Sequence, residues 1–128
     1  MATQDLTTGG TAQPWNAHEA VSIVPFSYSA VDNPAASGDD LKVLALPEDA
    51  LLIGLLITVT AGEGTDTIDI GFAAAGTTVK NSWTIATGDI DFVTPTRIPA
   101  SGGVWIHADA ALTTLELEGK AVVAYTNL

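Results

Sequence analysis

The chain has 128 residues, no cysteine, and 15 acidic against four basic residues, which gives a formal net charge of −11. A chain of this length normally forms one domain, and without cysteine neither disulfides nor thiolate-bound metals can stabilise it. Proteins bind phosphate backbones through basic groups that displace counterions, so this charge argues against nucleic acid and against an anionic membrane surface as partners. The apolar content of 47% is ordinary for a globular domain, so the acidity does not indicate disorder.

The N-terminal segment, residues 1–18, is small and polar and shows no hydrophobic period. It predicts an extended N-terminal arm that precedes a β-sandwich domain at residues 19–128. Pro14 and Trp15 stand out in this arm. Because a large aromatic side chain on a stiff backbone is a typical interface anchor, these two residues are the candidate partner contacts.

The first part of the predicted domain alternates strand and loop signals. Residues 19–30 predict a strand, and Pro25 within it places that strand at a sheet edge or at a bulge. Residues 31–40 carry the glycine, proline and asparagine of a loop, and residues 41–46 predict a short strand.

The stretch from residue 50 to residue 60 is the most apolar part of the chain. Because successive side chains of a strand point to opposite faces, large apolar residues at alternate positions predict a core-facing set. This set comprises Leu51, Ile53, Leu55, Ile57 and Val59. Glycine at position 54 and the β-branched run 57–60 disfavour a helix, and the charge-free run is shorter than the about 20 residues that span a membrane.

The remainder of the sequence predicts short strands separated by turns. Residues 62–65 predict a hairpin turn, and Ile68, Ile70 and Phe72 predict the buried face of the next strand. Further strands are expected at 82–86, 90–93, 104–109 and 114–118, and Glu118-Gly119 predicts a tight turn into a last strand. The whole pattern indicates an all-β fold, an antiparallel β-sandwich that is jelly-roll-like.

Several acidic residues could in principle bind an ion. Residues 62–70 fit part of a calcium-binding nonapeptide, but such sites need tandem copies and only one is present. Two carboxylates on the strand at 90–93 lack further ligands nearby in sequence. We therefore predict no metal site, while the sequence leaves open an ion near Asp66, Asp69, Asp89 or Asp91.

His107 and Asp109 could form a base and its orienting group, but a lone histidine on a strand face is more often structural. The sequence contains no nucleophile elbow, no zinc-protease helix motif, no phosphate-binding loop and no dinucleotide fingerprint. We therefore expect the protein not to be an enzyme, to have no catalytic residues and to need no cofactor.

Three segments of residues 41–128 carry a resemblance to a known family: LALPEDALLIGLLITVTA, DTIDIGFA and IHADAALTTLELEGKAVVAYTNL. They resemble the small virion structural proteins of tailed bacteriophages, in particular capsid decoration or cement proteins. The resemblance implies a jelly-roll-like fold, a homotrimer, and attachment to the major capsid protein. It also implies a place on the capsid exterior, where the protein would bridge adjacent capsomers after synthesis in the host cytoplasm.

Two other functions fit the same fold class. One is a phage tail or fibre component. The other is a carbohydrate-binding module, whose candidate platforms are Trp15, Trp83 and Trp105.

Overall fold

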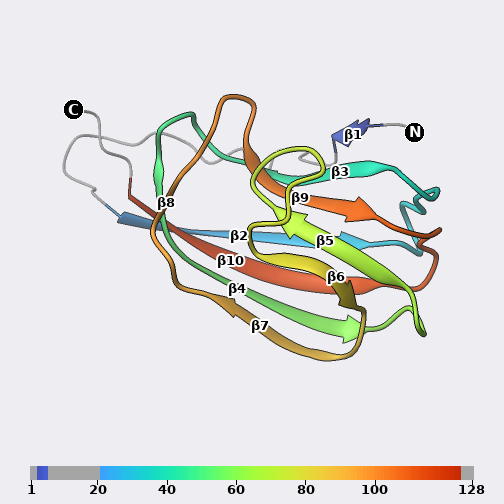
Figure 1. Cartoon of the computed structure of the whole chain (residues 1–128). Helices are drawn as coiled ribbons and strands as arrows, with labels where there is room; N and C mark the ends of the chain where they lie inside the picture. The colour runs from blue at the N-terminus through green and yellow to red at the C-terminus, as the bar shows by residue number, and fades with distance from the viewer. Residues whose placement is uncertain (1–2, 6–20, 125–128) are drawn as a thin grey trace.

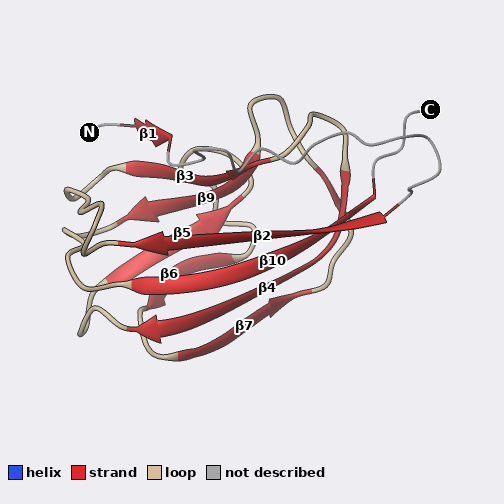
Figure 2. Ribbon diagram, turned by 180° about the vertical axis from the view of Figure 1, so that it is seen from behind, coloured by secondary structure: helices blue, strands red, loops and turns tan. Residues whose placement is uncertain are grey.

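The structure, a computed structural model, describes residues 3–5 and 21–124, which form ten strands in two facing sheets (Figures 1 and 2). Sheet A has the order β1-β3-β9-β5-β6 and sheet B the order β2-β10-β4-β7, with β8 paired to β4. The strands of sheet A are β1 (Thr3–Asp5), β3 (Asp40–Ala45), β5 (Thr67–Gly71), β6 (Lys80–Thr84) and β9 (Gly103–Ala108). Those of sheet B are β2 (Val21–Ser29), β4 (Leu51–Ala61), β7 (Gly88–Phe92), β8 (Thr96–Arg97) and β10 (Glu116–Ala124). The predicted all-β sandwich is confirmed.

The core lies between the two sheets and follows the predicted alternation in most strands. Ile68 and Ile70 on β5 are fully buried, and Phe72 just after that strand is 4% exposed. Large side chains from both sheets and from the loop before β10 are buried with them: Leu41, Leu44, Leu52, Ile57, Ile106, Leu115 and Leu117. Burying each such side chain stabilises the fold by about 1.5–3 kcal/mol, so the hydrophobic effect holds the two sheets together.

The core-facing set predicted for β4 is correct in its second half and wrong in its first. Leu55, Ile57 and Val59 are buried, but Ile53 is 38% exposed and Leu52 is fully buried. The register of β4 against β10 shifts by one residue at this point. A β-bulge adds one unpaired residue to a strand and so reverses the phase of the side chains on either side of it.

Two further predictions, both of tight turns, are wrong. Apart from the short β1 and β8, consecutive strands change sheet at every step except from β5 to β6. Residues 62–65 therefore do not close a hairpin but carry the chain from β4 in sheet B to β5 in sheet A. Glu118 and Gly119 do not form a turn, because both lie inside the continuous strand β10.

Pro25 lies within β2, which is an edge strand of sheet B and pairs with β10 alone. An edge strand leaves one row of backbone groups outside the ladder, which is where a residue without an N–H is tolerated. The edge position predicted for this strand is confirmed.

Part of the predicted arm is included in the described residues. Strand β1 pairs in parallel with β3, whereas every other strand pairing is antiparallel. Residues 6–18 lie outside the described part of the chain, and so do Pro14 and Trp15. No helix in the described ranges is long and apolar enough to cross a membrane.

Candidate functional site

The outer face of sheet B carries a group of exposed apolar side chains. Val21 and Ile23 on β2 are 53% and 63% exposed, and Leu56 on β4 is 41% exposed. Cross-strand pairing places Ile23 beside Val122, and it places both Pro25 and Leu56 beside Lys120. We call this group, Val21, Ile23, Pro25, Ile53 and Leu56, the apolar surface. It is the candidate interaction surface, since exposed apolar residues gathered on one face commonly mark a contact with another protein.

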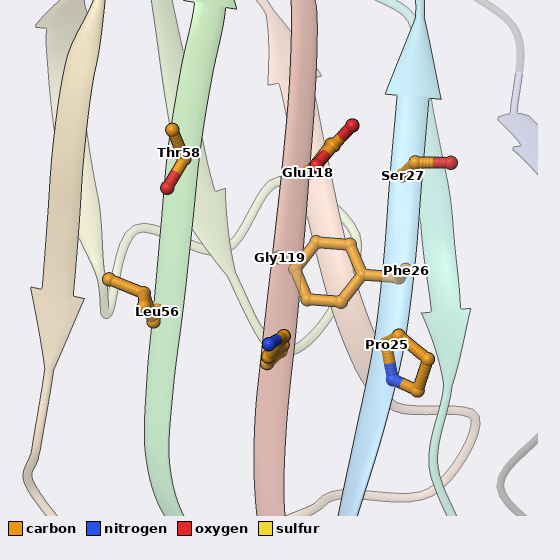
Figure 3. A pocket seen from close by; sticks show the side chains of 8 residues that line it. Pro25, Phe26, Ser27, Leu56, Thr58, Glu118 and Gly119 are labelled. Atoms are coloured by element: carbon orange, nitrogen blue, oxygen red, sulfur yellow. The ribbon is translucent and has the colours of Figure 1, made fainter.

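A groove in the same face runs between β2, β10 and β4 (Figure 3). Figure 3 shows the ring of Phe26 extending from β2 toward Gly119 on β10. The ring is buried with the core side chains, on the opposite face of sheet B from the exposed Pro25 and Leu56. A Cβ atom on Gly119 would lie 2.2 Å from Cζ of Phe26. Glycine is therefore needed at this position for the close approach of an aromatic ring.

The outer face of sheet A carries a polar cluster around His107. Strand register places His107 on β9 opposite Asp40 on β3 and opposite Asp69 on β5. Nδ1 of His107 lies 2.7 Å from Oδ1 of Asp40, and Nε2 lies 3.9 Å from Oδ1 of Asp109. We call Asp40, Asp69, His107 and Asp109 the His107 cluster. The structure thus brings His107 near Asp109, as the sequence suggested, but the closer partner is Asp40.

Sequence analysis did not find Asp40, which is 67 residues from His107 along the chain. The only signal was a carboxylate at the end of the predicted loop 31–40, directly before a predicted strand. Asp40 is 6% exposed, and its Oδ1 also accepts a hydrogen bond at 2.9 Å from the backbone N–H of Ala75. This hydrogen bond holds the loop between β5 and β6 against the start of β3.

Neither described tryptophan provides an exposed platform of the kind that binds sugars. Trp105 on β9 is 7% exposed, and the ammonium of Lys42 lies 5.8 Å from its ring centroid. Trp83 packs partly against the core. The third candidate, Trp15, lies outside the described residues.

Glu63, in the connection between β4 and β5, fixes the loop that precedes β10. Its carboxylate accepts hydrogen bonds from the backbone N–H groups of Thr113, Thr114 and Leu115 at 2.9, 2.8 and 2.7 Å. Desolvation by itself raises the pKa of Glu63, but these hydrogen bonds outweigh it and hold the pKa below its ordinary value. Glu63 is therefore a structural anion that ties the connection between β4 and β5 to the loop before β10.

Tyr28 fixes the turn after β2. Its hydroxyl donates a hydrogen bond to the carbonyl of Asn33 at 2.7 Å. Burial raises the pKa of Tyr28 to about 12, and the charges of Glu63 and Asp39 add to this effect. The hydroxyl is therefore protonated, and able to donate this hydrogen bond, at any physiological pH.

The other acidic candidates do not form a comparable cluster. Asp89 accepts a hydrogen bond from the hydroxyl of Thr58 at 2.8 Å, and Asp91 is exposed on the same strand. Within residues 3–5 and 21–124, only Asp69, His107 and Asp109 bring three possible metal ligands together. Neither Asp66 nor the carboxylates on β7 belong to such a group.

Comparison with known proteins shows what this fold resembles. No protein-family model and no curated protein matches the chain. A chain in the capsid of Ralstonia phage GP4 is 17% identical and superposes over 100% of both chains with a TM-score of 0.69. A chain of the cyanophage Pam1 capsid asymmetric unit is 16% identical, with 88% and 91% of the two chains covered and a TM-score of 0.61.

A third chain, from the acidic stable capsid structure of Helicobacter pylori bacteriophage KHP30, is 12% identical and covers 84% of this chain and 89% of its own length, with a TM-score of 0.55. At such identities the likeness is one of fold. The chain is an antiparallel β-sandwich protein. More particularly, its sandwich is similar to chains found in three bacteriophage capsid structures.

Proposed function

We propose that this chain is a structural protein of a bacteriophage virion and that it attaches to the capsid. One observation carries the proposal: the chain and a chain of the Ralstonia phage GP4 capsid superpose over their whole lengths. The order β2-β10-β4-β7 facing β3-β9-β5-β6 supports a jelly-roll connectivity for the shared sandwich.

Within that role, we propose a decoration or cement protein that binds the major capsid protein from outside and bridges adjacent capsomers. The family resemblance of residues 41–128 supports this assignment. The net charge of −11 also supports it, because an acidic protein is poorly suited to the DNA-filled interior. The same resemblance supports a homotrimer.

The apolar surface is the part of the described chain best suited to this contact. Its neighbours include three exposed carboxylates, of Glu118 on β10 and of Asp89 and Asp91 on β7, against one exposed ammonium, that of Lys120. Two copies of this face would bring like charges together, whereas a neutral or basic partner would not. The charge distribution therefore favours the capsid protein over a second copy of this chain at the apolar surface.

The protein would act by binding and not by catalysis. His107 is the one described histidine, and its ring is held between carboxylates with no serine or cysteine nucleophile among its recorded contacts. A His107→Ala variant that lost a hydrolytic activity of the wild type while keeping its fold would overturn this view.

The decisive experiment measures occupancy on capsids that lack the protein. Full-length protein and a variant without residues 2–16 are mixed with such capsids, and the bound fraction is measured by sedimentation and electron microscopy. We expect the full-length protein to occupy regular positions on the outer shell and the truncated protein to bind more weakly.

Three other outcomes separate the parts of the proposal. Equal occupancy by both proteins would remove the arm from the mechanism. Failure of the full-length protein to bind capsids would overturn the decoration role. Binding confined to tails would replace it with the role of a tail or fibre component.

A further inference from the structure

The His107 cluster has the geometry of a cation site on the outer face of sheet A. One ligand atom from each of Asp69, His107 and Asp109 lies within 4.8 Å of the other two. Asp69 and His107 are held by the neighbouring strands β5 and β9, and Asp109 follows β9 directly. Because strands hold side chains more rigidly than long loops do, this arrangement is built into the sheet.

The orientation of His107 suits metal binding. Its Nδ1 lies 2.7 Å from Oδ1 of the buried Asp40, so in the neutral ring Nδ1 donates and Nε2 keeps its lone pair. Nε2 is the nitrogen nearer to Asp109. A metal-binding histidine usually donates its other ring N–H to a carboxylate in this way, because the contact fixes both the tautomer and the direction of the ring.

The carboxylates of Asp69 and Asp109 each accept a hydrogen bond through one oxygen, so the other oxygen is available to a metal ion. Oδ2 of Asp109 accepts a hydrogen bond from the hydroxyl of Thr67 at 2.6 Å, and Oδ1 of Asp69 accepts one from the backbone N–H of Ser82 at 2.6 Å. The structure records no contact for the second oxygen of Asp69 and only the distant ring of His107 for that of Asp109. Asp69 and Asp109 thus each have a second carboxylate oxygen available to a metal ion, and one ligand atom of each lies within 4.8 Å of a ring nitrogen of His107.

The local charge is not balanced by basic side chains. In the described part of the chain, the recorded ion pairs of Asp40 and Asp109 involve His107 alone, and Asp69 has none. The three carboxylates surround a single imidazole in a protein of net charge −11. A bound cation would relieve this repulsion.

We propose that Asp69, His107 and Asp109 bind one divalent transition-metal ion of the zinc type, with Asp40 as the group that orients His107. Zinc accepts imidazole nitrogen and carboxylate oxygen at about 2.0–2.2 Å, whereas calcium and magnesium prefer oxygen ligands alone. Two ligands of a tetrahedral zinc ion lie about 3.3–3.6 Å apart. Small side-chain rotations would close the present separations, and water would complete the coordination.

The bound ion would tie β5 to the end of β9 and so stabilise sheet A. This role is independent of the proposed attachment to capsids, since the site lies on the other sheet from the apolar surface. A metal-loaded protein that fails to bind capsids would leave this inference intact.

The test uses untagged full-length protein that is treated with EDTA, dialysed, and titrated with ZnCl2 at pH 7.5 in a calorimeter. We expect one equivalent to bind in the micromolar range and the melting temperature to rise with zinc concentration, as binding to the native state requires. Asp109→Asn, at an exposed position, should weaken binding at least tenfold and leave the metal-free melting temperature within a few degrees. Asp91→Asn removes an exposed carboxylate outside the cluster and should bind zinc as the wild type does.

A His107→Gln variant should lose the preference for zinc over calcium. If that variant fails to fold, the comparison of Asp109→Asn with Asp91→Asn still decides the matter. Absence of zinc binding by the wild type would overturn the proposal and leave His107 as a partner of carboxylates only. Undiminished zinc binding by Asp109→Asn, or equally strong binding of calcium, would also overturn it.

Discussion

Phe26 and Gly119 face each other across β2 and β10 so closely that a methyl group on Gly119 would lie 2.2 Å from Cζ of the ring. We expect Gly119→Ala to destabilise the protein by about 1–3 kcal/mol, the usual cost of forcing extra volume into a packed site. Urea unfolding measures this cost.

Gly54→Ala is the matched control, because a Cβ atom there would meet nothing nearer than 3.7 Å. It should change stability by less than about 1 kcal/mol. Replacing the ring with a smaller side chain, Phe26→Leu, should partly offset the destabilisation caused by Gly119→Ala. The effects of the two changes on the free energy of unfolding should then not be additive. Strict additivity would show that the ring does not require the glycine.

The adjacent residues Leu55 and Leu56 separate the two faces of β4. Leu55 is 3% exposed and Leu56 is 41% exposed. We expect Leu55→Ala to cost about 2–5 kcal/mol and Leu56→Ala less than about 1 kcal/mol, since only the first leaves a cavity. Chemical denaturation measures both. Equal losses would contradict the assignment of the core face.

Glu63 makes stability depend on pH in a defined direction. Because its pKa is lowered in the folded state, its contribution is complete above the ordinary value of 4.5 and is lost as the pH falls through the folded value. At pH 7 we expect Glu63→Gln to cost about 1–2 kcal/mol through weakened hydrogen bonds to Thr113, Thr114 and Leu115.

The measurement is the difference in unfolding free energy between wild type and Glu63→Gln at pH 7 and again well below pH 4. The difference should shrink at the lower pH, where the wild-type carboxyl is protonated. A difference that stayed constant would show that the charge of Glu63 is not what holds the loop.

The apolar surface makes a prediction about attachment that is distinct from folding. Leu56→Asp should reduce occupancy on undecorated capsids at least tenfold, because a charge would have to be desolvated in the contact. Val31→Asp introduces the same charge at a residue that is 64% exposed and lies beyond the end of β2. It should bind as the wild type does. Equal effects of the two variants would point to general repulsion and away from a contact at Leu56.

The proposed homotrimer predicts a mass of three chains of 13.1 kDa each. Light scattering coupled to gel filtration should give this mass over a range of concentrations. A 13.1 kDa particle at every concentration, together with no threefold arrangement on the capsid, would contradict the trimer.

Side-chain alternation was sufficient to predict the faces of the regular strands, as Ile68 and Ile70 show. It was insufficient at Ile53, because a bulge is set by the partner strand and leaves no mark in the alternation itself. The predicted turn at Gly119 was wrong for a related reason. A glycine required by a turn and a glycine required by a neighbouring ring look the same in a sequence.

Pairings between distant residues limited the prediction of the sites. Asp40 lies 67 residues from His107, and Glu63 lies 52 residues from Leu115. Both contacts arise from strands that change sheet, which local patterns do not specify. The chemical type of each residue is evident in the sequence, but its contact partners are determined by the topology of the two sheets.

Strand β10 is the last described strand in the chain, yet it lies in the middle of sheet B between β2 and β4. These two earlier strands therefore have no central partner while the chain is being synthesised. Sheet B can close only after residues 116–124 have left the ribosome. Sandwiches built from such distant pairings fold over about milliseconds to seconds. Until then the apolar faces of β2 and β4 are exposed to aggregation, and chaperone binding to nascent chains would protect them.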